Sequence, residues 1–141
     1  MLTVKYIETE GEYQSARAIR EEVFIVGQNV PREIELDEYE DTATHIIAVE
    51  NELAIGTARW RCTDEGVKLE SFAVPESYRG KGVGVALVKF AINELREKNM
   101  IYLNAQEYVI SFYQKLNFEG IGDIFYEAGI PHQKMIYKKE F

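Results

Sequence analysis

The chain opens with a short stretch, residues 2–7, in which apolar and polar residues alternate as they do in a half-buried strand. Apolar residues then recur three or four positions apart as far as Phe24, which predicts a helix with one buried face that ends at a Gly27 cap. The following stretch, from Gln28 to Thr42, holds six acidic residues between Glu33 and Asp41 and no sustained apolar period. We therefore expect this stretch to be mainly loop.

Three β-prone runs come next, and turn residues separate them: 45–49, 54–62 and 67–74. A helical apolar stripe begins at Val83, a strand at Met100 and a further helix at Val109, before closing strands between Phe118 and Tyr137. The order strand, helix, three strands, helix, strand, helix, two strands predicts an α/β fold with a mixed, mostly antiparallel central sheet flanked by helices. We expect it to form a single domain over residues 1–141.

The most informative local pattern lies between the third β-prone run and the long helix, and it consists of Arg79, Gly80, Lys81, Gly82, Val83 and Gly84. Glycines let backbone N–H groups converge without obstruction by Cβ atoms, and the start of the helix adds unpaired donors and a partial positive charge. Arg79 and Lys81 add ionic contacts. The pattern predicts a pyrophosphate site that needs no metal.

Spacing separates three phosphate-binding patterns that compete for these residues. The P-loop pattern fails because Lys81 is followed by Gly82, and the dinucleotide-binding fingerprint fails because its third glycine would fall on Val85 or Leu87. The remaining pattern, [QR]-x-x-G-x-[GA], is satisfied by Arg79, Gly82 and Gly84.

With this motif the chain resembles the GNAT superfamily of acyl-CoA-dependent N-acyltransferases. The resemblance extends, in the family's order, to the preceding strand 69–74, to residues 103–106 and to the helix that ends at 112–118. Residues 20–24, 28–31 and 129–132, with Glu35, Asp37 and His45, resemble a group of small bacterial GNAT proteins with poorly defined substrates. Gly27 departs from that group, which often carries an acid there.

The resemblance implies a sheet that splays between its fourth and fifth strands and admits the pantetheine arm of acetyl-CoA, which acts as co-substrate. It implies that the backbone of Phe72, Ala73 and Val74 holds the pantetheine amide and polarises the thioester. It also implies a coenzyme contact for Asn104, whose alternative is an amide that satisfies backbone groups where strands diverge.

Acyl transfer to an amine needs a base for the nitrogen and an acid for the departing thiolate. Tyr113 matches the family tyrosine that protonates the thiolate, and the alternative is a core tyrosine with a hydrogen-bonded hydroxyl. Glu70 is two residues before Phe72, so we expect it on the same strand face, either as the base or paired to Arg59 or Arg61.

Other polar residues have less specific patterns. His45 and His132 are further candidates for the base, and each has a structural alternative. The acids of the 28–42 stretch, Glu35 and Asp37 among them, line a pocket for a cationic amine or form a solvated loop, and we expect His132 to contact the acceptor. The two distant histidines and one cysteine form no recognisable metal-binding pattern, so we expect no metal.

Composition narrows the class of partner. The chain has 24 acidic and 16 basic residues and a net charge of −8, which argues against nucleic acid or an anionic membrane and is compatible with a cationic amine. Cys62 is the single cysteine, and neither a signal peptide nor a membrane-spanning run is evident, so we expect a reduced, cytoplasmic protein.

These patterns together predict an N-acetyltransferase that moves an acetyl group from acetyl-CoA to a primary amine of a small molecule or peptide by direct attack in a ternary complex. The rival hypothesis is a non-catalytic acyl-CoA-binding sensor or interaction module. The sequence leaves the acceptor, the base and the oligomeric state open, a homodimer included.

Overall fold

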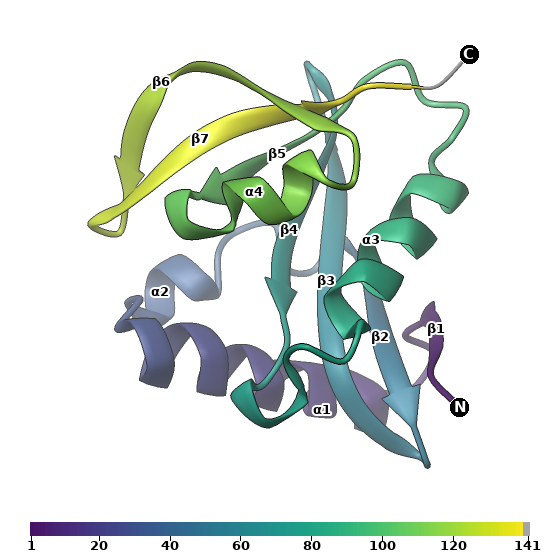
Figure 1. Ribbon diagram of the computed structural model, residues 1–141. Helices are drawn as coiled ribbons and strands as arrows, with labels where there is room; N and C mark the ends of the chain where they lie inside the picture. Colours follow the sequence, from purple (N-terminus) through teal and green to yellow (C-terminus); the bar gives the residue numbers. More distant parts are fainter. Residues whose placement is uncertain (140–141) are drawn as a thin grey trace.

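The computed structural model describes residues 1–139, and these residues form a seven-stranded sheet in the order β1-β2-β3-β4-β5-β7-β6 (Figure 1). The strands are β1 (Thr3–Tyr6), β2 (Thr44–Glu50), β3 (Leu53–Thr63), β4 (Gly66–Ala73), β5 (Ile101–Gln106), β6 (Phe118–Glu127) and β7 (Ile130–Tyr137). All neighbouring strands pair antiparallel except β4 and β5, which pair in parallel. The predicted mixed, mostly antiparallel sheet is therefore confirmed.

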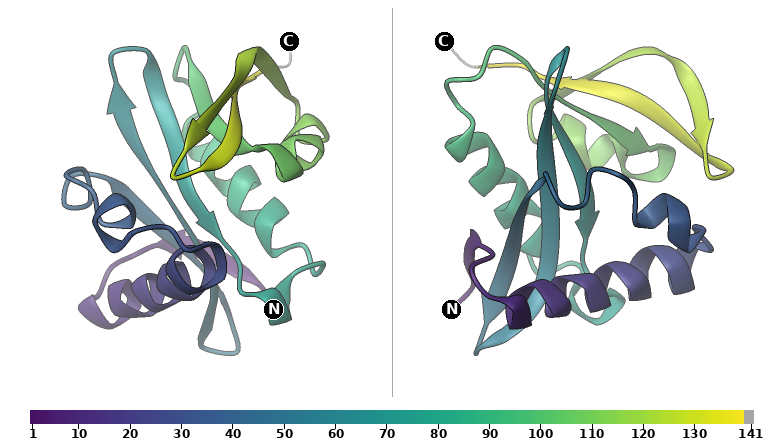
Figure 2. Two further views of the ribbon diagram at one scale, coloured as in Figure 1. Left: turned by 90° about the vertical axis from the view of Figure 1, so that its left-hand side faces the viewer. Right: turned by 180° about the vertical axis from the view of Figure 1, so that it is seen from behind.

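Helices cover both faces of this sheet (Figure 2). The helical elements are α1 (Glu10–Arg20), its π-helical continuation η1 (Glu21–Val26), α2 (Arg32–Glu35), η2 (Glu76–Tyr78), α3 (Val83–Glu94), η3 (Glu107–Val109) and α4 (Ile110–Gln114). A capping box starts α1, because the Thr9 hydroxyl accepts from the Glu12 N–H at 3.1 Å and the Glu12 carboxylate accepts from the Thr9 N–H. None of the helices within residues 1–139 is long and apolar enough to cross a membrane.

The first helix ends later than the sequence pattern predicts. Gly27 has a right-handed φ of −75°, and the left-handed turn comes at Asn29, where φ is 56°. The Val30 N–H closes this end by donating to the Phe24 carbonyl at 2.9 Å. The Gly27 cap was therefore wrong, because asparagine is the other residue that readily adopts the left-handed conformation. The stretch expected to be loop also contains the single helical turn α2, just after Pro31.

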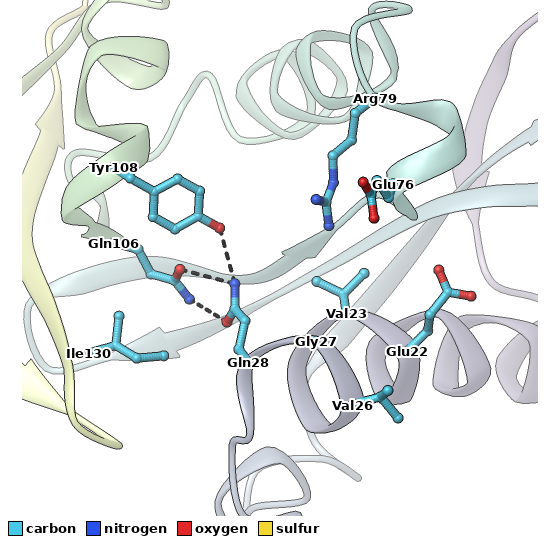
Figure 3. Close-up of a pocket in the computed structure, with 10 residues that line it drawn as sticks. All are labelled: Glu22, Val23, Val26, Gly27, Gln28, Glu76, Arg79, Gln106, Tyr108 and Ile130. Carbon is cyan, nitrogen blue, oxygen red and sulfur yellow. Dashed lines mark hydrogen bonds between the residues drawn. The ribbon is translucent and has the colours of Figure 1, made fainter.

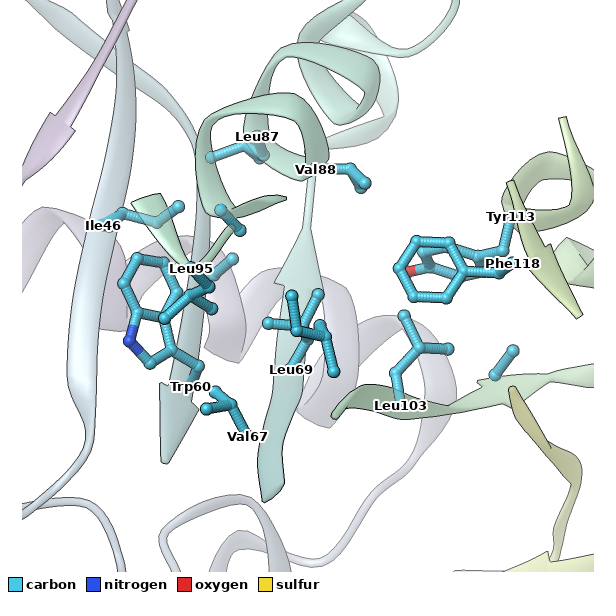
Figure 4. Close-up of a cluster of buried hydrophobic side chains, with 14 of the residues drawn as sticks. Ile46, Trp60, Val67, Leu69, Leu87, Val88, Leu95, Leu103, Tyr113 and Phe118 are labelled. Carbon is cyan, nitrogen blue, oxygen red and sulfur yellow. The ribbon is translucent and has the colours of Figure 1, made fainter. Parts of the chain in front are cut away.

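The main core lies between the sheet and the helices α3 and α4 (Figure 4). Leu87 on α3 and Leu69 and Leu103 on neighbouring strands are at most 2% exposed, and Trp60 closes the cluster toward β2. Full burial of each such side chain contributes about 1.5–3 kcal/mol. A smaller cluster, Ile19 and Val23 with Ala73, attaches α1 and η1 to the opposite face.

The sheet opens between β4 and β5. These strands pair only from Val67 opposite Ile101 to Leu69 opposite Leu103, although β4 continues to Ala73 and β5 to Gln106. The splay that the resemblance implies is confirmed.

Beyond Leu69, strand β4 carries a bulge. The register with β3 shifts between Thr57 and Arg59, and Ser71 has a left-handed φ of 55°. The extra residue reverses the alternation of side chains, so that Leu69 belongs to the main core and Ala73 to the smaller cluster on the other face.

Candidate active site

The predicted anion-binding turn lies at the N-terminus of α3. Gly80 and Gly82 have left-handed φ values of 77° and 82°, which favour glycine, and a Cβ at either would meet no described atom within 4 Å. Gly82 is the N-cap, it has no side-chain capping bond, and its carbonyl accepts from Ala86 at 3.0 Å. The turn thus presents the first N–H groups of α3 to open space, an arrangement that suits a phosphate.

The other residues of the motif have different surroundings. Arg79 donates from Nε to the Val74 carbonyl at 2.9 Å, and Lys81 lies over the Tyr78 ring with Nζ 5.6 Å from its centroid. Val83 is buried in the core. Gly84 allows α3 to approach α4, because a Cβ there would lie 3.3 Å from the Phe112 ring.

A cavity of about 660 Å³ opens beside this turn, where β4 and β5 diverge (Figure 3). We call it the coenzyme-side cavity. Arg79 and Glu76 line one side, Tyr108 and Gln106 the other, and the end of the first helix, including Gln28, lines the floor. The sequence pattern did not single out Gln106, Tyr108 or Gln28 for this role, although Gln28 and Gln106 lie within the motifs quoted above.

The end of β4 has backbone groups free on the side that faces the gap. Phe72, Ala73 and Val74 follow the last residue of β4 that pairs with β5 within the described chain. The Val74 carbonyl already accepts from Arg79 Nε. The other N–H and C=O groups that point into the gap can bond a polar, extended ligand. This is the position expected for the backbone that holds a pantetheine amide.

Tyr113 of α4 lies on the α3 side of the same gap. It is 7% exposed and packs edge-on against Phe72, Phe112 and Phe118, with ring centroids 6.3, 5.0 and 5.7 Å apart. Burial raises the pKa of the Tyr113 phenol. The hydroxyl therefore stays protonated at neutral pH, as a proton donor must be, although the same burial makes release of the proton less favourable.

Glu70 and Phe72 lie on opposite faces of the sheet. Phe72 packs against the main core, whereas the Glu70 carboxylate lies 3.1 Å from Arg59, 3.0 Å from Arg61 and 3.2 Å from Lys68. The prediction that the two share a face was wrong, because the bulge at Ser71 inserts a residue between them. The alternative, pairing of Glu70 with Arg59 or Arg61, is what the structure contains.

A second cavity of about 190 Å³, the acceptor-side cavity, lies on the face of the sheet that carries Glu70. It gathers residues from four segments far apart in sequence: Glu35, Asp37, Glu70, Asn104, Gln106 and His132. Asn104 thus lines this cavity and not the coenzyme-side cavity. The sequence-predicted acceptor residues Glu35, Asp37 and His132 do come together here.

The two acids predicted to bind the acceptor, Glu35 and Asp37, already have cationic partners. Glu35 lies 2.9 Å from Arg20, and Asp37 lies 2.6 Å from Arg59. Burial raises the pKa of Glu35 despite Arg20, whereas Arg59 lowers the pKa of Asp37 against the effect of burial. Because arginines pair with both carboxylates, neither is a free site for a cationic amine.

Glu40 connects these pairs beneath the first helix. It contacts Arg20 at 2.7 Å and Arg59 at 2.9 Å, and it accepts a hydrogen bond from Tyr13. Burial opposes ionisation, but the hydrogen bonds from Arg20 and Tyr13 lower the pKa of Glu40 to about 2. His45 joins the same cluster through Nε2, which lies 2.9 Å from the Glu40 carbonyl, and it lines neither cavity.

Comparisons with known proteins agree with this geometry. Residues 8–139 match the model of the acetyltransferase (GNAT) domain family. The chain is 36% identical over 132 residues to the uncharacterized N-acetyltransferase YjcF of Bacillus subtilis, covering 92% of this chain and 94% of that protein.

Solved structures share the fold at lower identity. An acyl-CoA N-acyltransferase from Pseudomonas aeruginosa superimposes with a TM-score of 0.84 at 23% identity, covering 98% of this chain and 99% of that one. A GNAT family acetyltransferase from Elizabethkingia anophelis with acetyl-CoA bound gives a TM-score of 0.68 at 19% identity, covering 96% and 94%. The protein therefore belongs to the GNAT acetyltransferase family, which confirms the family, the fold and the enzyme class predicted from its sequence.

Proposed function

We propose that the protein transfers an acetyl group from acetyl-CoA to a primary amine by direct attack in a ternary complex. The observation that carries this proposal is the pair of cavities at the gap between β4 and β5. They meet at Gln106 and Ile130, which line both. Substrates bound in the two cavities would bring a thioester and an amine together at this boundary, and no covalent enzyme intermediate is then needed.

Two features beside the coenzyme-side cavity suit acetyl-CoA: the glycine turn before α3 and the end of β4 that does not pair with β5. In this proposal the turn from Arg79 to Gly84 binds pyrophosphate, and the backbone of Phe72 to Val74 binds the pantetheine amide and polarises the thioester carbonyl. The acetyl-CoA bound to the Elizabethkingia relative supports the choice of coenzyme.

The chemical step needs only groups that this site can supply. The nitrogen lone pair of a neutral amine attacks the thioester carbon, an N–C bond forms, and the carbonyl oxygen takes negative charge beside backbone N–H donors. The carbonyl then re-forms, the C–S bond breaks, the nitrogen gives up one proton to a base, and the thiolate takes the phenolic proton of Tyr113, which solvent later replaces. The products are the N-acetylated amine and free coenzyme A.

The acceptor side favours a small monoamine with a short apolar arm. Its volume of about 190 Å³ is less than a third of the 660 Å³ of the coenzyme-side cavity. Phe24, Val30 and Ile34 supply apolar walls, while arginines neutralise Glu35 and Asp37. Glu35 and Asp37 therefore shape the cavity in this proposal, and the amine is recognised by its size.

Thiol release from acetyl-CoA tests the proposal. The protein should release coenzyme A faster in the presence of short primary alkylamines and single amino acids than with polyamines or aminosugars, and mass spectrometry should show the acetylated amine. The Tyr113→Phe variant is the matched low-activity control. Tight coenzyme binding without turnover on a broad amine panel would instead identify an acyl-CoA-binding sensor.

A further inference from the structure

His132 is held in one orientation by two contacts. On β7 it stands opposite Phe125 of β6, and the two rings stack with centroids 5.8 Å apart and planes 21° apart. Its Nδ1 lies 2.7 Å from the Ile130 carbonyl oxygen. A carbonyl can only accept, so Nδ1 carries the proton and Nε2 keeps its lone pair in the neutral ring.

The lone pair on Nε2 is available to a ligand. Nε2 has no hydrogen-bond partner among residues 1–139, and it is not one of the buried atoms left without a partner. The residue as a whole is only 7% exposed and lines the acceptor-side cavity. The cavity is therefore the space through which a proton donor can reach Nε2.

The other candidate bases are already engaged. Both Glu70 oxygens contact cations, with Arg59 and Arg61 at one and Lys68 at the other. His45 uses Nε2 to contact the Glu40 carbonyl and lies outside both cavities. The titratable and charged groups that line the cavity with His132 are Glu35, Asp37, Arg59, Lys68, Glu70 and Glu127.

The residue that would remove a proton from the amine and the residue that would deliver one to the thiolate lie on opposite faces of the sheet. His132 stands directly opposite Gln106 of β5, so both side chains lie on the acceptor-side face. Leu103 and Met135, which also stand opposite each other on these strands, point into the main core beside Tyr113. An amine that approaches from the acceptor side meets Nε2, and a thiolate leaves on the side of the tyrosine.

We infer that His132 is the general base, and that its Nε2 takes the proton from the attacking amine nitrogen. This inference rests on the proposed acetyl transfer. As the N–C bond forms, the nitrogen loses one proton to Nε2, and the departing sulfur gains one from Tyr113. The imidazolium later releases its proton to solvent, and the phenolate regains one, so each turnover is balanced.

The sharpest variant is His132→Asn, because the asparagine side-chain N–H can still donate to the Ile130 carbonyl while nothing replaces Nε2. With a panel amine as substrate, kcat at neutral pH should fall ~10²–10⁴-fold, and the KM for acetyl-CoA should stay near the wild-type value. The limb of the wild-type pH profile that reports protonation of the base should disappear, and only the rise that follows the neutral fraction of the amine should remain. His45→Gln is the matched control and should keep the acidic limb.

The inference would be overturned if His132→Asn kept the wild-type acidic limb. If Glu70→Gln lost that limb at the same time, the base would be Glu70. A second measurement needs no acceptor. Diethyl pyrocarbonate acylates unprotonated imidazole nitrogen, so peptide mapping should find His132 modified faster than His45, the only other histidine. Slower modification of His132 would overturn the inference, even if no amine were turned over and the proposed function itself had failed.

Discussion

Gln28 and Gln106 exchange two side-chain hydrogen bonds, of 3.1 and 2.8 Å, between the end of the first helix and the end of β5 (Figure 3). Gln28 also donates to the Tyr108 hydroxyl at 3.0 Å. Gln106 lines both cavities. The amide pair therefore stands at the boundary between the two cavities, where the proposed reaction brings the amine to the thioester.

Loss of this pair should disturb the boundary at which the two cavities meet. In Gln28→Ala and Gln106→Ala we expect kcat/KM for the amine to fall about tenfold, which corresponds to ~1.4 kcal/mol. A double-mutant cycle on kcat/KM should give a coupling of ~0.5–3 kcal/mol. Additive effects of the two substitutions would mean that the pair does not act as a unit.

Gly82→Val should weaken coenzyme binding. Its φ of 82° is unfavourable for a β-branched residue, so the turn must change and the N–H groups at the start of α3 lose their alignment. Calorimetry with coenzyme A should show at least a tenfold rise in Kd, or ~1.4 kcal/mol.

The control for this experiment is Gly122→Val in β6. Gly122 also has a left-handed φ, 74°, with no described atom within 4 Å of a Cβ, and it lines neither cavity. It should show a similar loss of stability with an unchanged Kd. An unchanged Kd in folded Gly82→Val would place the pyrophosphate elsewhere.

Tyr113→Phe removes only the hydroxyl that we assign to the leaving thiolate. We expect kcat to fall ~10²–10⁴-fold while coenzyme affinity survives. Tyr102→Phe is matched to it, because Tyr102 is also buried and its hydroxyl bonds Thr63 at 2.7 Å away from both cavities. Equal effects of the two substitutions on kcat would show that the role of Tyr113 is purely structural.

Glu40 should make stability depend on pH in the acidic range. Its pKa is about 2 in the folded protein against an ordinary value of 4.5, so its contribution is complete above pH 4.5 and is lost as the pH falls toward 2. This contribution is ~3 kcal/mol in order of magnitude. Urea unfolding should show that Glu40→Gln has a much lower free energy of unfolding than the wild type at pH 7, and that this difference is smaller at pH 3.

Glu38→Gln is the control for that measurement, because Glu38 is exposed and has no ion pair among residues 1–139. Its free energy of unfolding should follow the wild type at both pH values. A Glu40→Gln variant as stable as the wild type at pH 7 would show that the arginines find other partners.

Local sequence was sufficient for the order of the strands and main helices and for the glycine turn before α3. Alternating and helical spacings identify strands and helices without knowledge of their neighbours, and the left-handed positions at Gly80 and Gly82 need glycine for a purely local reason. The family motif then supplied the splay between β4 and β5, which periodicity does not encode.

The chemistry of the site depends on contacts that only the folded chain makes. One left-handed residue, Ser71, places Phe72 and Glu70 on opposite faces, and strand periodicity cannot foresee such a bulge. Arg59 pairs with Asp37 and Glu70 from another strand, and Gln28 meets Gln106 across 78 positions. Composition shows that these groups are present, but the tertiary structure decides which charges are neutralised, because each of these pairings joins residues distant in sequence. It also leaves Nε2 of His132 without a hydrogen-bond partner among residues 1–139.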